Sequence, residues 1–182
     1  DKNDPQSKVR QVARIESEDF VNWSKTEVIL QGDDPDHQIY SMPVFFYGGI
    51  YLGLPAIHQQ STDLVWTELA WSEDTKDWHR ISAGKPLIPR SKEEFDYDYG
   101  CVYAGAPVFR ENEIRIYYGG SDWLHTGWRN AYMCLATLRP DGFAGYQQKA
   151  SGSPAIITTT TLSNTDLPWR ITADIVEGGS VV

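Results

Sequence analysis

A repeated turn motif is the feature that most restricts the fold of this chain. The pattern S-E-D-x-x-x-W occurs at residues 17–23 and again at residues 72–78, 55 positions later (72 minus 17). Repeats of this kind, roughly 40 to 50 residues long, are typical of β-propellers, in which each repeat forms one four-stranded blade. The motif therefore favours a chain built from such blades.

Short alternating segments flank both copies of the motif. Residues 9–15 and 65–71 precede the copies, and residues 27–30 and 87–88 follow them, so each motif is expected to form the turn between two antiparallel strands. A degenerate third copy at residues 139–143 keeps the turn Asp and replaces the Trp with Phe143. We therefore predict an all-β chain of four-stranded antiparallel blades, part of a propeller.

A second repeat defines the extent of each predicted blade. The sequence P-V-F occurs at 43–45 and 107–109, each time followed by a tight turn and an aromatic strand. Residues 1–30 then supply the outer half of one blade, residues 31 to about 90 a second and residues 91 to about 148 a third. We predict blades over residues 1–150, and a closing strand or the start of a β-sandwich over residues 151–182.

Two and a half blades do not close a ring, so exposed strand edges need cover. A second copy of the chain, as a homo-oligomer, would supply that cover, or the missing blades would come from a longer chain. We favour the longer chain.

Charge and hydropathy exclude several partners. The formal net charge is -9, and no basic cluster offsets it, so nucleic acid is not an expected partner. No apolar run approaches the roughly 20 residues of a membrane helix, and the polar start is not a signal peptide. The localisation stays open, and a secreted or periplasmic protein is compatible with removal of a leader from a precursor.

The sequence predicts neither a metal site nor a cofactor. Cys101 and Cys134 are the two cysteines, and we expect buried free thiols, with one disulfide as the alternative. No Cys or His spacing is typical of zinc, and the acidic residues 33–36 lack the spacing of an EF-hand.

Three stretches resemble the five-bladed propeller glycoside hydrolases related to the invertase and arabinanase families. They are A-W-S-E-D-T-K-D-W-H-R at 70–80, Y-Y-G-G at 117–120 and L-A-T-L-R-P-D-G-F at 135–143. The likeness covers residues 9 to about 150 and implies the C-terminal part of such a propeller, with a β-sandwich following. The first-blade Asp that acts as nucleophile or base in that family has no counterpart in this chain.

One rim of the predicted channel gathers the residues that could do chemistry. Residues just before the first strand of a blade and just after its second strand share this rim, because the two strands form a hairpin. For substrate binding, the rim gives Asp36, His37, His58, Asp96, Tyr99, Asp122, Trp123 and Arg129.

Glycoside hydrolysis needs two carboxyl groups, about 5 Å apart in retaining enzymes or about 6.5 to 9.5 Å apart in inverting ones. Asp34 and Asp98 are the candidate pair, and His125 is the third candidate catalytic residue. The acidic run at 33–36 is also compatible with a solvated turn. The Trp rings near His125 would either stack on a sugar or pack against the blade.

The predicted function is therefore a glycosidase that acts on an oligo- or polysaccharide through two carboxylates at the propeller channel. The alternative is a carbohydrate-binding or scaffolding propeller without catalysis, and a protein-interaction propeller is a third class. A sialidase is a weaker enzyme candidate, because the turn motif lacks the glycine of the sialidase Asp box and no Arg triad is evident.

Overall fold

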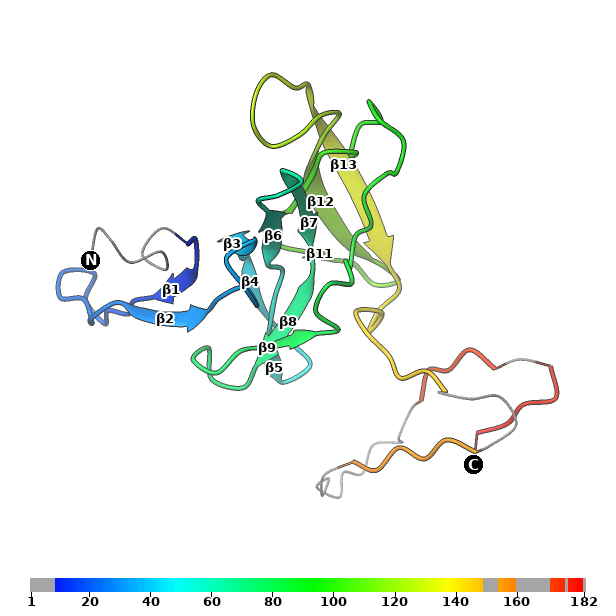
Figure 1. The fold of residues 1–182 in the computed structure, drawn as a ribbon. Helices are drawn as coiled ribbons and strands as arrows, with labels where there is room; N and C mark the ends of the chain where they lie inside the picture. The colour runs from blue at the N-terminus through cyan, green and yellow to red at the C-terminus, as the bar shows by residue number, and fades with distance from the viewer. Residues whose placement is uncertain (1–8, 149–153, 160–170, 176, 182) are drawn as a thin grey trace. The chain divides into compact units, whose positions relative to one another are not determined.

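The computed structural model describes residues 9–148, 154–159, 171–175 and 177–181. Contacts divide the chain into two units, Asp1–Gly145 and Tyr146–Val182. Every secondary-structure element in the described residues is a β-strand, which confirms the predicted all-β fold class (Figure 1). Within these residues, no helix is long and apolar enough to cross a membrane.

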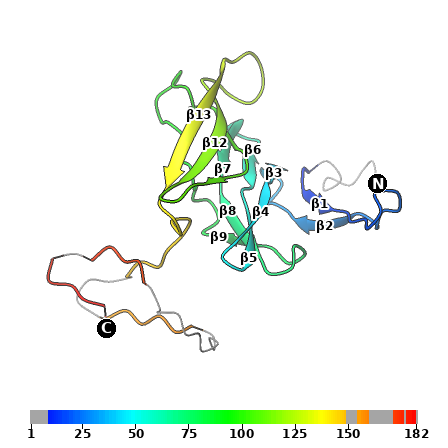
Figure 2. The ribbon, with the colours of Figure 1, turned by 180° about the vertical axis from the view of Figure 1, so that it is seen from behind.

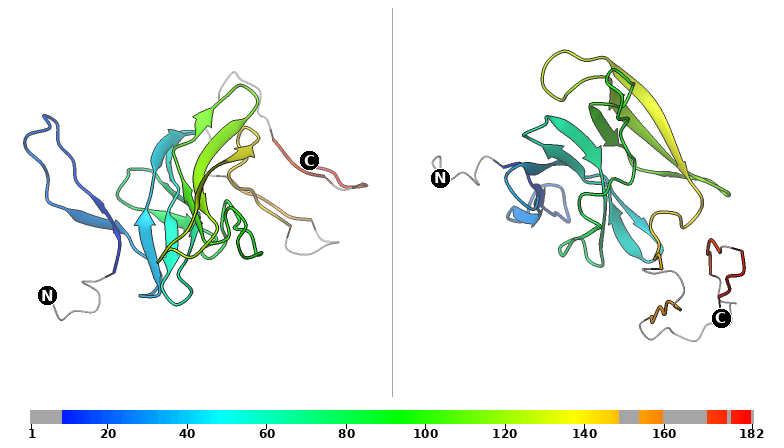
Figure 3. Two further views of the ribbon diagram at one scale, coloured as in Figure 1. Left: turned by 90° about the horizontal axis from the view of Figure 1, so that it is seen from above. Right: turned by 45° about the vertical axis from the view of Figure 1, so that its right-hand side comes forward.

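The first unit contains three sheets. A hairpin of β1 (Val12–Arg14) and β2 (Glu27–Leu30) projects beyond the other two sheets (Figure 3). The four-stranded antiparallel sheet has the order β4 (Val44–Tyr47), β5 (Ile50–Gly53), β8 (Leu69–Ser72), β9 (His79–Ile81). The third sheet contains β3 (His37–Ser41), β6 (Ala56–Gln59), β7 (Leu64–Thr67), β10 (Cys101–Ala104), β11 (Val108–Phe109), β12 (Ile114–Ser121) and β13 (Ala131–Leu138).

Residues 37–81 form one bent, four-stranded antiparallel meander that passes through two of these sheets. Its first three strands each run through both sheets, as β3 and β4, β5 and β6, and β7 and β8. Proline has no N–H for the ladder, so Pro43 and Pro55 interrupt the first two strands. The N–H groups of Leu54 and Glu68 donate to the carbonyls of Pro43 and Pro55 at 3.0 and 2.9 Å, which keeps the ladder continuous across the bend.

The two turn motifs lie between antiparallel strands, as predicted. The first joins β1 to β2 and the second joins β8 to β9. Asp19 accepts hydrogen bonds from the N–H groups of the residues two and three positions later, at 2.8 and 2.7 Å, and Asp74 does the same at 2.8 and 3.0 Å. Both Asp side chains therefore form their turns. Trp78 is buried, whereas Trp23 is half exposed.

The strand after the second motif differs from the prediction. The strand that pairs with β8 is β9, residues 79–81, because the motif turn is short. Residues 87–88, predicted as that strand, instead lie against Thr67, through a single bridge from Ile88 and a 2.8 Å hydrogen bond from Leu87 N–H. The alternating segment 65–71 is broken at Glu68 into β7 and β8.

A second antiparallel meander begins with β10 and β11, which pair with the long strand β12. Strand β12 pairs along its whole length with β13, and Figure 2 shows these two long strands side by side. The first strand of this second meander contacts the preceding meander through a parallel bridge between Cys101 of β10 and Val65 of β7. Cys101 and Cys134 are free thiols.

The hydrophobic core contains side chains from both meanders. Leu52, Leu54 and Leu69 pack with Val102, Ala104, Ile114, Ile116, Tyr118 and Phe143. Phe143, from the degenerate third motif, is therefore a core residue. A smaller cluster of Ala56, Val65 and Cys101, with Tyr103 against it, covers the opposite face of β10.

One charged pair is buried within this framework. Glu68 has a side chain that is 0% exposed and accepts from Arg80 Nη2 at 2.7 Å, and Arg80 is 7% exposed. The indole N–H of Trp66 and the backbone N–H of Gly84 complete the hydrogen bonds of this carboxylate, at 2.8 and 2.9 Å. Glu68 is therefore fully engaged in holding β7, β8 and β9 together.

Residues 151–182, for which a closing strand or the start of a β-sandwich is predicted, lie in the second unit. Residues 151–153, 160–170, 176 and 182 of that prediction lie outside the described residues. The described residues 154–159, 171–175 and 177–181 contain no strand.

Candidate functional site

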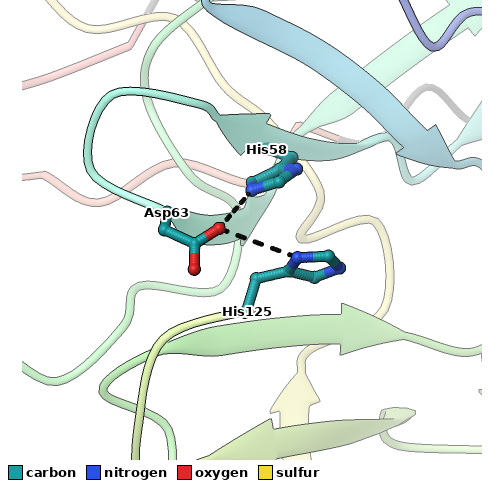
Figure 4. A group of neighbouring side chains, drawn as sticks. All are labelled: His58, Asp63 and His125. Atoms are coloured by element: carbon teal, nitrogen blue, oxygen red, sulfur yellow. Dashed lines mark hydrogen bonds and ion pairs between the residues drawn. The ribbon is translucent and has the colours of Figure 1, made fainter. Parts of the chain in front are cut away.

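His58, Asp63 and His125 meet beside the smaller hydrophobic cluster. His58 lies on β6 and is buried, Asp63 lies in the turn between β6 and β7, and His125 lies in the loop between β12 and β13. One carboxylate oxygen of Asp63 is 2.9 Å from His58 Nε2 and 3.7 Å from His125 Nδ1 (Figure 4). The two imidazole rings are 4.4 Å apart between centroids.

Asp36 fixes the turn that carries Asp63. Its carboxylate accepts from Ser61 N–H at 2.6 Å and from the Ser61 hydroxyl at 2.8 Å, and its own carbonyl accepts from Gln60 N–H at 2.8 Å. Asp63 itself has a φ of 58°, in the left-handed region that Asp tolerates better than most residues. The start of β3 therefore positions the turn after β6.

Asp63 in turn anchors the loop that carries His125. The backbone N–H of His125 donates to the Asp63 carbonyl at 2.9 Å, and Thr126 N–H donates to the Asp63 carboxylate at 2.6 Å. Asp122 closes the other end of this loop, because its carboxylate accepts from the backbone and side-chain N–H groups of Asn130 at 2.9 and 2.6 Å. The loop between β12 and β13 is thus held at both ends.

The charges in this cluster follow from burial and hydrogen bonding. Burial raises the pKa of Asp63, but hydrogen bonds from Thr126 and His58 outweigh it, so the pKa lies below its ordinary value. Burial, and then the neighbouring His58, lower the pKa of His125. Near neutral pH the cluster therefore contains a carboxylate beside a neutral His125 imidazole.

One nitrogen of His125 lacks a partner. Its Nδ1 is buried and has no hydrogen-bond partner among the described residues. Its separation from the Asp63 oxygen is 3.7 Å, which is too long for a hydrogen bond. A buried polar atom of this kind calls for an explanation, such as an ion, a water or a ligand.

Aromatic and cationic side chains surround the two histidines. The ring of Tyr40, on β3, lies 5.1 Å from the ring of His125 and 5.5 Å from that of Tyr103, on β10. The guanidinium of Arg10 lies 5.0 Å above the Tyr40 ring. Burial raises the pKa of Tyr103, so its hydroxyl stays protonated at physiological pH. The surroundings thus combine hydrogen-bonding groups with flat apolar surfaces.

The structure brings together some of the residues predicted from the sequence. His58 and His125 are in contact, Arg129 donates to the His125 carbonyl, and Asp36 and Asp122 position the two loops. Among the described residues, no hydrogen bond, ion pair or ring contact joins Asp34 or Asp98 to this cluster. The catalytic pairing of Asp34 with Asp98 stays a prediction.

Asp34 and His37 form a separate pair at the surface. Asp34 accepts from Asp36 N–H at 2.8 Å and from His37 N–H at 2.9 Å, and lies 3.0 Å from His37 Nδ1. Hydrogen bonds from His37 lower the pKa of Asp34. Its carboxylate is half exposed, so it is open to solvent while forming the turn before β3.

Asp98 lies on the other face of β10 from His125. On this strand, Cys101 and Tyr103 face the smaller cluster, whereas Val102 and Ala104 face the main core with Tyr118. The buried Asp98 accepts from the Tyr118 hydroxyl at 2.9 Å and from Ser91 N–H at 3.2 Å. Asp96 accepts from the Ser91 hydroxyl at 2.5 Å.

The two Trp residues near His125 have different environments. Trp123 stacks on Phe95 at 5.0 Å with an interplanar angle of 10°, and Tyr99 lies 6.0 Å from it. The Trp123 ring therefore packs against Phe95 and Tyr99. Trp128 is 87% exposed, which leaves its ring open to a ligand.

Sequence reasoning missed Asp63, Tyr40 and Tyr103. Asp63 satisfies the same positional rule as His58, because it lies in the turn between the second and third strands of its meander. The two Tyr residues lie within strands, where the alternating pattern predicts that they are core residues. A signal for Asp63 was thus present in the sequence, whereas none was present for the tyrosines.

No protein-family model and no curated protein sequence matches this chain. Among solved structures, a glycoside hydrolase is similar over 79% of this chain and 40% of its own, with a TM-score of 0.58 and 16% identity. A complex of BT0996 with RGII is similar over 60% of this chain and 35% of its own, with a TM-score of 0.50 and 14% identity. The chain thus spans less than half the length of either structure. Its fold is similar to that of a solved glycoside hydrolase.

Proposed function

We propose that this chain is part of a glycoside hydrolase acting on an oligo- or polysaccharide, and that its meanders are blades of a five-bladed propeller. The likeness to a glycoside hydrolase structure supports the fold of this proposal. The BT0996 complex with RGII supports the choice of a carbohydrate ligand. The remaining blades would come from further chain or from a second copy.

The observation that carries the proposal is the meeting of His58 and Asp63 with His125, which lies on the same loop as the exposed Trp128. Sugars are bound by planar aromatic surfaces together with hydrogen-bonding groups. Trp128 supplies the open ring, and the Asp63 carboxylate and the histidines lie near the same loop. Arg129 and Asp122 support the loop from within.

We propose three candidates for the catalytic carboxyl groups. Asp34 and Asp98 are the pair expected from the sequence, and Asp63 is the carboxylate that lies against His125. Asp34 is open to solvent, whereas Asp98 is buried under Tyr118. Access therefore favours Asp34 over Asp98 as a group that touches substrate. His37, Asp96, Tyr99 and Trp123 are proposed as more distant substrate contacts.

The test is reducing-sugar release from a panel of plant and microbial oligosaccharides. We expect release by the wild-type protein and a fall of about 100-fold or more when the catalytic carboxyl group is replaced, in Asp34→Asn, Asp63→Asn or Asp98→Asn. Asp33→Asn is the matched control, because Asp33 is an exposed neighbour whose described partner is Arg80.

The variants that lose activity identify the catalytic carboxyl groups. Loss in Asp34→Asn and Asp98→Asn together would assign the predicted pair. Loss in Asp63→Asn alone would assign the cluster. Saturable oligosaccharide binding without any product would contradict hydrolysis and support the non-catalytic binding protein.

A further inference from the structure

We propose that His58, Asp63 and His125 bind one divalent transition-metal ion, with Zn²⁺ as the best match. Their ligand atoms all lie within 4.8 Å of one another (Figure 4). Two imidazoles and one carboxylate are a typical ligand set for zinc, whereas Ca²⁺ and Mg²⁺ prefer six or more oxygen ligands.

Two of the three ligand separations are close to those of a tetrahedral ion. Zinc–nitrogen and zinc–oxygen distances of about 2.0 to 2.2 Å place any two ligands of a tetrahedral site about 3.3 to 3.5 Å apart. The Asp63 oxygen is 2.9 Å from His58 Nε2 and 3.7 Å from His125 Nδ1. Shifts of a few tenths of an ångström bring both pairs into this range. The two histidine nitrogens lie within 4.8 Å of each other and would have to approach by up to about 1.3 Å. Three protein ligands leave the fourth position for water.

The orphan nitrogen of His125 is the observation that distinguishes this cluster from an ordinary hydrogen-bonded group. Its Nδ1 is buried, points towards the Asp63 oxygen, and has no hydrogen-bond partner among the described residues. A metal ion between the three side chains would give this nitrogen a partner. The His125 backbone N–H is bonded to the Asp63 carbonyl, so the ligand is held in place before an ion arrives.

Neighbouring groups orient the other two ligands. The Gln60 side chain lies 2.8 Å from His58 Nδ1. With its amide turned over, its oxygen accepts the Nδ1 proton and leaves the lone pair of Nε2 for the ion, and the two amide orientations occupy the same space. Thr126 donates its N–H to the second Asp63 oxygen at 2.6 Å, and so fixes the plane of the carboxylate.

Charge both favours and limits binding. The carboxylate gives the site one negative charge, which complements a divalent ion. Arg10 and Arg129 are close enough to influence His125 electrostatically, and their positive charge opposes the ion. We therefore expect weaker binding than in a site with several anionic ligands.

Titration of the metal-free 182-residue chain tests the proposal. Isothermal calorimetry with Zn²⁺, and visible absorbance with Co²⁺ as a spectroscopic probe, should give one ion per chain, with Ca²⁺ and Mg²⁺ failing to compete. His125→Ala and His58→Ala should each weaken Zn²⁺ binding by about 10-fold or more. His37→Ala is the matched control, because His37 also pairs with an Asp at 3.0 Å but lies at the surface.

Three results would overturn the proposal: no Zn²⁺ binding by folded wild-type protein, unchanged binding in both cluster variants, or equal loss in His37→Ala. The first result does not depend on the folding of any variant. The titration contains no sugar, so its outcome is independent of the glycoside hydrolase proposal.

Discussion

Replacement of Glu68 by alanine is expected to lower the free energy of unfolding by about 3 to 5 kcal/mol, since it leaves Arg80 buried with one exposed partner. Glu68 is fully buried and bonds to Arg80 Nε and Nη2 at 3.0 and 2.7 Å. The change also removes the acceptor for Trp66 and for Gly84 N–H. Urea unfolding followed by tryptophan fluorescence measures the difference.

Asp33→Ala is the matched control for this prediction. Asp33 binds the same Arg80 side chain at 2.7 Å, but its own side chain is 64% exposed. Solvent screens such a pair, so its removal should cost less than about 1 kcal/mol. Equal effects of the two substitutions would show that burial does not set the contribution of Glu68.

Gly100→Ala is expected to lower the free energy of unfolding by about 3 kcal/mol and to displace the loop that carries His125 and Trp128. A Cβ at position 100 would lie 1.6 Å from the carbonyl oxygen of Trp123, which is backbone and cannot rotate away. Gly100 also joins β7 to β12, because its N–H donates to Ser121 and its carbonyl accepts from Val65. The strand contact and the loop are therefore affected together.

Gly119→Ala is the control for the glycine prediction. Gly119 lies on β12, and a Cβ there would meet nothing within 4 Å. Thermal unfolding should show a clear loss of stability in Gly100→Ala and none in Gly119→Ala. The same midpoint in both variants would mean that the loop moves without cost, and would contradict the description of a loop fixed at both ends.

The local features of the fold were predictable from the sequence. Alternating residues predicted β2 with its observed bounds, and the repeated Asp turns lie between strands as expected. The break at Glu68 was not predictable from the segment itself, because Glu68 lies opposite Pro55 at the bend and its carboxylate is buried against Arg80, 12 positions later. Alternation at residues 65–71 continues through this position, so only the partner in space shows that a carboxylate is buried there.

The candidate site was predictable only in part, for the same reason. Positions at strand ends indicated His58 and His125, which the structure brings into contact. Their common partner, Asp63, is 63 positions from the Thr126 that orients it, so no local pattern links the two. Asp98 satisfies the same positional rule, yet its carboxylate is buried and accepts from Tyr118, a residue of the main core.

Oligosaccharide binding tests the central claim, that the loop between β12 and β13 presents a carbohydrate site. Calorimetric titration of the folded chain should show saturable binding of at least one member of the panel. Trp128→Ala should weaken that binding about tenfold or more, equivalent to about 1.4 kcal/mol. Phe46→Ala, which removes an aromatic ring that is 61% exposed on β4, should leave it unchanged. No saturable binding, or equal binding by wild type and Trp128→Ala, would contradict the account.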